Sequence, residues 1–224
     1  MSALLSTADS WLKHLERGYD VGAVFFDFKK AFDRVPHLPL VSKLQQLNLD
    51  PNIVSWVHNY LAGRKQSVVV NGASSEHLPV LSGVPQGSIL GPLLFLIYID
   101  DLTNTELSEG TEIVLYADDI LLYRPISSEN DFVALQSDVY HIETWATSNF
   151  MSFNLSKCKV MHVSRKRSPL SPTNPIMLGG TVLEVVSTFK YLGLLISSNM
   201  SWSNHIKDIC SKARKILGLL YRRY

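Results

Sequence analysis

Long apolar runs and paired cysteines are both missing from this sequence. No stretch approaches the ~18 consecutive apolar residues that a membrane-spanning helix requires. Acidic and polar residues interrupt the N-terminal MSALLSTADSWLKHLERGYD too early for a signal peptide. The two cysteines, Cys158 and Cys210, belong to no CxxC or Cys/His pattern. We therefore expect reduced thiols in an intracellular protein without a membrane partner, rather than a disulfide framework or a zinc site.

Charge of one sign does not dominate the chain as a whole, because the formal net charge is only +1. The two parts of the chain nevertheless differ. Residues 1–150 contain nine Lys/Arg against eighteen Asp/Glu, whereas residues 151–224 contain twelve against two. An acidic first part and a basic second part indicate a metal-binding half and a polyanion-binding half. A basic surface that is simply solvated is the alternative explanation.

Internal repeats are also absent, so the fold class has to come from local patterns. The 224 residues suit one domain with attachments or two small ones, and 46% hydrophobic residues suffice for a sizeable core. Apolar spacing predicts helices at 1–18, 39–48, 52–62 and 128–150 and a basic amphipathic helix at the C-terminus. Strands are predicted at 22–28, 66–72, 77–83, 113–117 and 120–123, and within KVMHVS and TFKYLGLLIS. Helices and strands alternate irregularly, so the predicted class is α+β.

Two short stretches contain paired aspartates, YIDDL at 98–102 and YADDI at 116–120. The first pair ends a uniformly apolar segment that follows a Gly-Pro pair and suits a core helix or a buried strand equally well. A loop-forming Thr-Asn-Thr run comes next. Asp100 and Asp101 are therefore expected where the segment reaches the surface, as solvated carboxylates.

The second pair lies between two short apolar runs, Ile113–Ala117 and Ile120–Tyr123. These runs predict a tight hairpin with Asp118 and Asp119 at its tip. Asn-Gly or Asp-Gly would favour such a turn, whereas two adjacent carboxylates repel each other beside a low-dielectric core. A divalent cation relieves this repulsion. The second pair is therefore predicted to belong to a functional site.

A third carboxylate, Asp27, follows the run Gly22–Phe26, which is expected to form a buried strand. Such a strand beside the hairpin would set Asp27 against Asp118. Three acids around one point can hold two Mg²⁺ ions ~3.5–4 Å apart, which activates an attacking hydroxyl and stabilises a leaving pyrophosphate. Asp33 lies six residues later in a turn rich in Lys and Arg, where we expect a structural cap or an ion-pair partner.

Five motifs in order resemble the reverse transcriptase of non-LTR (LINE-type) retrotransposons, closest to the jockey-like elements. They are FFDFKKAFDRVPH, GVPQGSILGPLLF, YADDILLY, NLSKCKVM and FKYLGLLIS, and they cover nearly the whole chain. The resemblance implies a polymerase palm, an antiparallel sheet with helices on one face, with partial fingers and the start of a thumb. On this interpretation residues 1–20 end the fingers, 21–196 form the palm with a fingers-like insertion at about 40–80, and 197–224 begin the thumb.

The resemblance also implies which residues carry the chemistry. Asp27, Asp118 and Asp119 would be catalytic carboxylates and metal ligands, and the backbone carbonyl of Phe28 would face a metal. The ion would be Mg²⁺, with Mn²⁺ as an alternative. Lys157 resembles the lysine that protonates the leaving pyrophosphate, which is general-acid work. A plain surface lysine is the alternative.

Other positions would contact the nucleotide and the nucleic acid. Phe32 resembles the bulky gate that excludes a ribose 2′-hydroxyl, although an ordinary core Phe explains it too. Gln86 and Gly87 resemble the turn that contacts the incoming nucleotide and the template. The loop that grips the primer end would be Tyr191, Leu192 and Gly193. Phosphates of template and primer would be held by Arg165, Lys166, Arg167, Lys207, Lys212, Arg214, Lys215, Arg222 and Arg223.

The partners implied are an RNA template, a DNA primer and a dNTP, and the compartment implied is the nucleus. Upstream fingers motifs, an endonuclease domain and a Cys/His nucleic-acid module are missing, so a palm cut from a larger polymerase is expected. Two alternatives remain: an inactive relic or co-opted module that binds RNA or a partner, and a palm-like nucleotidyl cyclase or two-metal nuclease. A cyclase or nuclease would need neither the PQG turn nor a basic thumb. The sequence indicates no oligomeric state.

Overall fold

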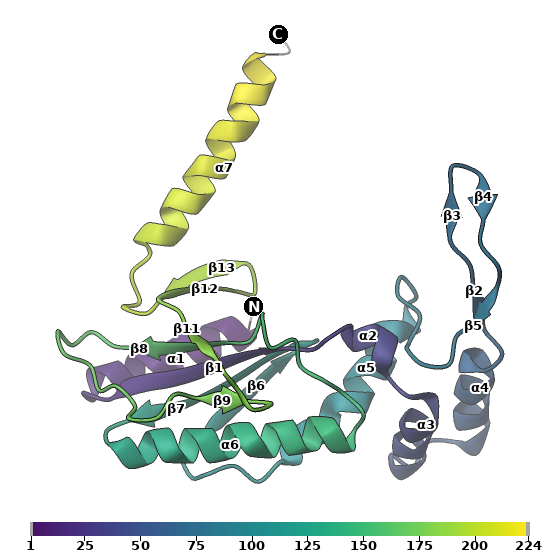
Figure 1. Ribbon diagram of the computed structural model, residues 1–224, viewed down its shortest axis with the longest axis horizontal. Coiled ribbons are helices and arrows are strands. Elements are labelled where there is room, and N and C mark those ends of the chain that lie inside the picture. Colours follow the sequence, from purple (N-terminus) through teal and green to yellow (C-terminus); the bar gives the residue numbers. More distant parts are fainter. Residues whose placement is uncertain (1, 223–224) are drawn as a thin grey trace.

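A five-stranded sheet forms the centre of the computed structural model, which describes residues 2–222 (Figure 1). The strand order is β11-β8-β1-β7-β6. Every neighbouring pair is antiparallel except β11 and β8, which are parallel. The strands are β1 (Asp20–Asp27), β6 (Glu112–Tyr116), β7 (Asp119–Ile126), β8 (Lys159–Val163) and β11 (Glu184–Val185). The predicted α+β class with an antiparallel palm sheet is therefore confirmed.

Both faces of the sheet are covered, because β1 is apolar on both sides. Val24 and Phe26 join the core under α6 (Glu129–Ser148), whereas Ala23 and Phe25 join a second core with Trp11 of α1 (Ser2–Glu16). Alternate residues of a strand face opposite sides, so each side needs its own cover. The expectation of helices on one face holds for α6, but α1 lies on the other face (Figure 1).

Four helices lie beyond the end of the sheet at which β1 finishes (Figure 1). They are α2 (Ala31–Arg34), α3 (His37–Gln46), α4 (Pro51–Leu61) and α5 (Leu90–Ile99). Helix α3 begins two residues before the predicted Pro39, because the Pro36 carbonyl already accepts the Leu40 amide. The ambiguous apolar segment is the helix α5, which continues into a 3-10 turn, η1 (Asp100–Asn104).

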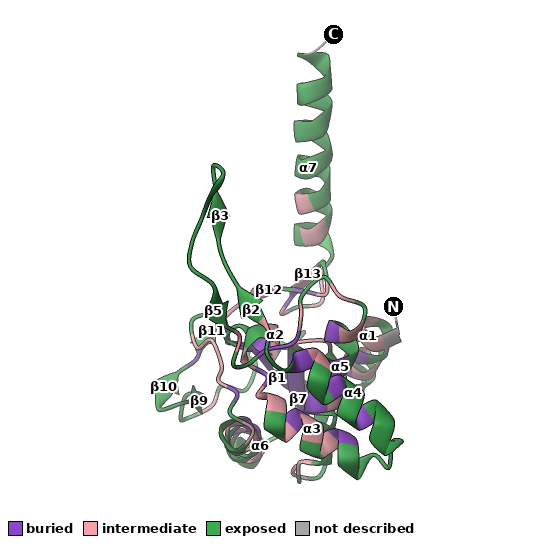
Figure 2. Ribbon diagram, turned by 90° about the vertical axis from the view of Figure 1, so that its right-hand side faces the viewer, coloured by how far each residue is buried: buried purple, intermediate pink, exposed green. Residues whose placement is uncertain are grey.

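A narrow hairpin projects from these helices and is exposed along its length (Figure 2). Its base pairs β2 (Lys65–Gln66) with β5 (Leu78–Pro79), and its tip pairs β3 (Val69–Val70) with β4 (Ala73–Ser74). The predicted strands at 66–72 and 77–83 were therefore too long. Asn71 and Gly72 have φ of 50° and 85° and make a two-residue turn, so the chain reverses at once into β4.

The C-terminal part adds two small hairpins and a projecting helix. The hairpins pair β9 (Met177–Leu178) with β10 (Thr181–Val182) and β12 (Thr188–Tyr191) with β13 (Leu194–Ser197). Helix α7 (Ser203–Tyr221) follows and has no buried residue. Within residues 2–222 no helix is both long and apolar enough to cross a membrane.

Candidate active site

Strand register brings two of the three aspartates face to face. Asp27 ends β1 and is the direct cross-strand partner of Asp119, the first residue of β7. The expectation that Asp27 faces Asp118 is therefore wrong by one position. Asp118 lies instead in the two-residue turn with Ala117, whose φ of 52° closes the β6–β7 hairpin. The hairpin itself is confirmed, but its turn is Ala-Asp rather than Asp-Asp.

Burial and two neighbouring carboxylates make Asp119 costly to ionise. Desolvation, together with the charges of Asp118 and Asp27, raises the pKa of Asp119. The Oδ1 atom of Asp27 is buried without a hydrogen-bond partner. Its Oδ2 atom lies 3.3 Å from the Nζ of Lys157, the nearest compensating charge. The site therefore has hard oxygen donors and uncompensated negative charge.

This donor set fits a hard divalent cation, which prefers carboxylate oxygens. The observation that supports the fit is the orphaned Asp27 oxygen beside the two hairpin carboxylates. No three His, Cys, Asp or Glu side chains within residues 2–222 form a ready-made cage. That agrees with the habit of Mg²⁺, which uses one or two carboxylates plus substrate phosphates rather than an all-protein cage.

Hydrogen bonds and ring stacking fix the end of β1, and they come from residues that the motif reasoning did not single out. The amide of Asp27 donates to the Sγ of Cys158 at 3.4 Å, and the carbonyl of Asp27 accepts from the Asn154 amide at 2.7 Å. Phe28 stacks on Phe153 with ring centroids 4.9 Å apart. Burial raises the pKa of the Cys158 thiol, which keeps it a neutral packing group. The motif NLSKCKVM is the signal that could have found Asn154 and Cys158, and Phe153 directly precedes it.

A pocket of about 370 Å³ opens beside the acids. Its lining includes Asp27 and Asp119 and three lysines, Lys157, Lys159 and Lys190, among mainly apolar residues. Sequence reasoning identified Lys157 but missed the other two. Lys159 also pairs with Glu184 at 2.7 Å. Negative and positive groups thus line one space that is large enough for phosphate oxygens.

Tyr191 borders the same pocket, and the predicted primer loop follows it. Burial and the charge of Asp119 raise the pKa of Tyr191 to about 12, and its buried hydroxyl has no hydrogen-bond partner. Leu192 and Gly193 have φ of 46° and 87° and form the turn between β12 and β13. The structure therefore places Tyr191 beside Asp27 and Asp119, and the turn at Leu192 and Gly193 follows it in the chain.

The segment 82–86 is bound to α2, which carries the predicted gate. Phe32 is partly exposed and stacks on Phe95 with centroids 4.5 Å apart. Its carbonyl accepts the amide of Val84 at 2.8 Å. One residue later, Asp33 accepts a hydrogen bond at 2.9 Å from Nε2 of Gln86. Within residues 2–222 Asp33 makes no ion pair, so it is a partner of the Gln86 amide rather than the expected cap or salt bridge.

The PQG turn also packs tightly on α5. A Cβ atom on Gly91 would lie 2.2 Å from the carbonyl oxygen of Pro85, so only glycine fits there. The Ser88 hydroxyl donates to the same carbonyl at 2.7 Å and accepts the Gly91 amide at 2.9 Å. Gly87, with φ of 80°, has no atom within 4 Å of a built Cβ, which leaves its outer side open for approach.

The other acidic pair lies outside the site. Asp100 is exposed, as predicted. Asp101 is not simply solvated, because its Oδ1 accepts from Lys43 Nζ at 2.7 Å and from Trp145 Nε1 at 3.2 Å. Asp101 therefore ties η1 to α3 and α6, and only the hairpin pair faces Asp27.

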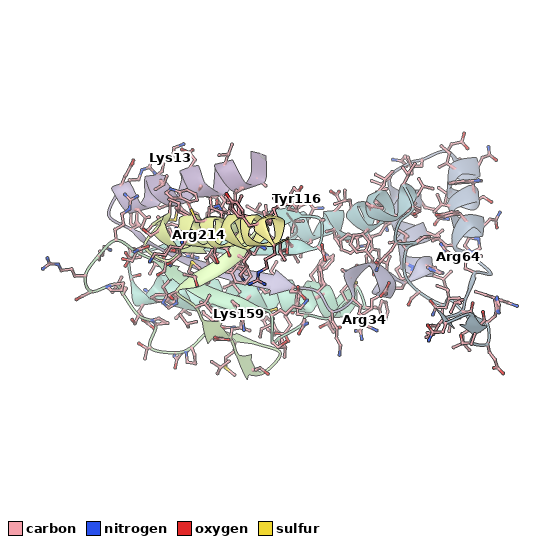
Figure 3. The ribbon with its side chains drawn as sticks, turned by 90° about the horizontal axis from the view of Figure 1, so that it is seen from above. Lys13, Arg34, Arg64, Tyr116, Lys159 and Arg214 are labelled. Carbon is pink, nitrogen blue, oxygen red and sulfur yellow. The ribbon has the colours of Figure 1, made fainter. Side chains whose placement is uncertain are left out.

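The predicted phosphate-binding residues fall into two distant groups. Arg165, Lys166 and Arg167 are exposed at the end of the sheet where β1 begins, and Lys166 pairs with Asp20 at 3.3 Å. The eight residues of β1 separate this loop from Asp27 by about 23 Å. Lys212 and Lys215 lie on α7, which also carries Arg214 and rises above the sheet (Figure 3). These residues are not brought to the acids themselves.

Comparison with known proteins agrees with this geometry. Residues 4–196 match the family described as reverse transcriptase (RNA-dependent DNA polymerase). The RNA-directed DNA polymerase from mobile element jockey of Drosophila funebris is 31% identical over 204 residues, which are 88% of this chain and 22% of that protein. The probable RNA-directed DNA polymerase from transposon X-element of Drosophila melanogaster is 31% identical over 196 residues, 86% of this chain and 21% of that one.

Solved structures show the same fold at low identity. A telomerase from Candida tropicalis, in complex with a TWJ fragment of telomeric RNA, is 11% identical with a TM-score of 0.61 and covers 91% of this chain. This chain covers 33% of that one. A truncated apo telomerase of the same organism gives 15% identity and a TM-score of 0.57, over 88% of this chain and 39% of that one. The present chain spans about a fifth of the length of the jockey and X-element relatives.

Proposed function

The chain belongs to the reverse transcriptase family, in the branch of the non-LTR retrotransposons, and from this we propose that it carries out RNA-directed DNA synthesis. The proposed reaction transfers a nucleotidyl group from a dNTP to the 3′-hydroxyl of a DNA primer paired with an RNA template. The observation that carries the proposal is the cross-strand pair Asp27–Asp119 with Asp118 in the adjoining turn. Such a reaction is mostly positioning and electrostatics, which this arrangement suits.

The proposed cofactor is Mg²⁺, with Mn²⁺ as an alternative. Asp27, Asp118, Asp119 and the carbonyl of Phe28 would hold it, and their uncompensated charge supports that assignment. When bound, such ions stabilise negative charge on the attacking and leaving oxygens. The chain's own contribution is to hold the carboxylates in register at the ends of two paired strands.

Basic and aromatic groups around the acids would position the nucleotide. Lys157, 3.3 Å from Asp27, would hold a proton where the leaving pyrophosphate needs one, and Lys190 adds positive charge in the same pocket. Phe32, supported from behind by Phe95, would exclude a ribose 2′-hydroxyl. Gln86 and Gly87 would contact the base pair that forms, with Gln86 oriented by Asp33.

The primer and the template would lie against the C-terminal half. The turn at Leu192 and Gly193 follows Tyr191, which lines the pocket of the acids, and would grip the primer end. Helix α7 would hold backbone phosphates of the hybrid, and the loop 165–167 could reach only duplex that has already left the site.

Primer extension tests the proposal most directly. The chain is given an RNA template, a DNA primer, dNTPs and Mg²⁺, beside its Asp118→Ala and Asp100→Asn variants. Asp118→Ala should reduce extension by about 100-fold or more, the scale on which one electrostatic stabiliser contributes. Asp100→Asn removes an exposed carboxylate charge outside the site and should leave most of the extension activity. An equal loss of primer extension in both variants, or no extension by the parent, would contradict the proposal for this chain.

A further inference from the structure

A small apolar pocket lies between α1 and β13, away from the acids. Its volume is about 110 Å³. The lining comes from one face of α1, which includes Leu4, Ala8 and Trp11, from all four residues of β13 and from residues 200–202. Residues 200–202 carry the chain from β13 up to α7 (Figure 1). Segments from the two ends of the chain thus line one space.

The pocket exists because the two elements are anchored separately. Helix α1 packs on β1 and β6, and its Trp11 is fully buried, with its ring centroid 5.8 Å from that of Tyr123. Strand β13 pairs with β12 and packs against the start of α7. Protein interiors normally contain few voids larger than a water molecule. Here the side chains of α1 and β13 leave a larger space that neither element fills.

The lining and the volume together limit what can occupy the pocket. None of the twelve lining residues is charged, and the surface that they present is apolar. A charged molecule would lose its hydration there without compensation. An apolar cavity of about 150 Å³ takes up benzene. A space of about 110 Å³ therefore suits one uncharged aromatic ring, whereas a lipid chain is too large for it.

Two features show that the chain itself satisfies this lining poorly. Met200 has a φ of 56°, a left-handed conformation that is unfavourable for a residue with a side chain, and it packs against the core around Trp11. Such strain is concentrated at ligand clamps and switch regions. The Oγ1 of Thr7 and the Nε1 of Trp11 are buried, and neither has a hydrogen-bond partner within residues 2–222. Both atoms are covered, so the pocket surface stays apolar.

The rim of the pocket favours a free molecule over a side chain of a protein partner. Leu5 and Trp202 are the exposed members of the lining, at 60% and 53%. The other lining residues are buried or half-buried. A protein that inserted one side chain would need a wider apolar surface around it. A free ring needs only the pocket.

We propose that this pocket binds one small, uncharged, single-ring aromatic molecule, and that the bound ring weakens the hold on the primer. Strand β12, the partner of β13, contains Tyr191, which lines the pocket of Asp27 and Asp119. Residues 200–202 lead into α7. A ring that pushes β13 away from α1 therefore displaces both elements that would hold the primer. This effect on the primer rests on the proposed function, whereas binding of the ring does not.

The first test is a titration of the full chain with fluorobenzene, followed by ¹⁹F NMR. The expected Kd is about 1 mM or lower, an affinity within reach of a molecule with so few heavy atoms. Ala8→Leu fills the pocket from α1 and should abolish binding, because no room for a ring remains. Ala134→Leu makes the same replacement on α6, at a half-buried position outside the lining, and should leave Kd unchanged.

A second measurement locates the ring without any pocket variant. The five methionines are labelled with ¹³C in their methyl groups, and the Met200 signal is assigned by its loss in Met200→Leu. Fluorobenzene should shift the Met200 methyl signal and leave those of Met151 and Met177, which lie outside the lining. A larger shift at either of these two methionines overturns the site. So does fluorobenzene that fails to bind the parent up to its solubility limit, or that binds Ala8→Leu equally well.

The effect on the primer is measured as the Kd of a fluorescent primer–template with and without saturating fluorobenzene. This Kd should rise about fivefold, the lower end of typical coupling between two sites, in the parent and in Ala134→Leu. It should stay constant in Ala8→Leu. A parent that binds the ring with no change in primer–template Kd overturns the effect on the primer.

Primer extension on the same samples keeps this inference separate from the proposed function. A parent that binds fluorobenzene beside Met200 but does not extend a primer contradicts the polymerase proposal and supports the pocket. A parent that extends a primer but does not bind fluorobenzene has the opposite meaning.

Discussion

The hydrogen bond from Gln86 Nε2 to Asp33 decides which end of the Gln86 amide remains free. Because the carboxylate takes an N–H group, the carbonyl Oε1 is the end left for a substrate. Gln86 is exposed and would otherwise rotate among several rotamers. Asp33 follows Phe32 directly on α2, so one short helix positions both the gate and the amide.

The coupling of Asp33 to Gln86 predicts non-additive kinetics. Asp33→Ala should raise the KM for dNTP about tenfold and change kcat little, since a hydrogen bond to a charged group contributes about 1.5 kcal/mol at the low end. In a Gln86→Ala background the same substitution should have no further effect. Steady-state primer extension with the four chains measures this. Additive losses would show that Asp33 acts independently of Gln86.

At the scale of elements, the N-terminus of α5 is fitted against the PQG turn. The first turn of α5 contains Gly91, and the Pro85 carbonyl occupies the space of its missing side chain. The same turn places Gln86 in the lining of a cleft between α2 and the base of the β2–β5 hairpin, and it leaves open space beside Gly87. Any group that pushes α5 away from Pro85 therefore also displaces the PQG turn.

Gly91→Ala should destabilise the fold by about 1–3 kcal/mol through overpacking, which lowers the melting temperature by several degrees. Primer extension should fall with it, because the turn moves. Gly218→Ala in α7 is the matched control: no atom lies within 4 Å of its Cβ, so alanine should be neutral or slightly stabilising there. Thermal melting of the two variants measures the difference. Equal melting temperatures would show that the Pro85 carbonyl moves aside for the alanine methyl group without loss of stability.

At the scale of the whole molecule, α7 stands apart from the packed core (Figure 2). None of its residues is buried, and His205 and Asn204 in its first turn hydrogen-bond to Leu195 and Ser197 of β13. Its described charges are four basic residues against Asp208, which itself pairs with Lys212. A helix with this composition contributes positive potential rather than stability.

Removal of residues 203–224 should therefore leave the melting temperature nearly unchanged and weaken primer–template binding. Each lost phosphate contact should also lower the slope of log Kd against log salt by about 0.9 for a duplex. Anisotropy titrations over a range of KCl concentrations, with thermal melting of the same samples, measure both. An unchanged salt slope would remove α7 from the nucleic-acid interface.

The sequence by itself determined the elements whose pattern is local. The unbroken apolar run of β1 predicts a buried strand, the apolar runs around Asp118 and Asp119 predict a hairpin, and the spacing of 128–150 predicts α6. The three candidate aspartates follow from the same patterns. Each depends on residues a few positions apart, which is the distance over which backbone geometry repeats.

Only the tertiary structure decided the relations between segments. Register, which follows from how β1 and β7 pack, set Asp27 against Asp119 rather than Asp118. Residues 90–99 are apolar all round, so their pattern carries no period, and burial between other elements settled that they form a helix. The Asp33–Gln86 contact and the cleft beside Arg64 join residues that lie tens of positions apart. Such contacts depend on the shape of everything that packs between them, which no local pattern of side chains contains.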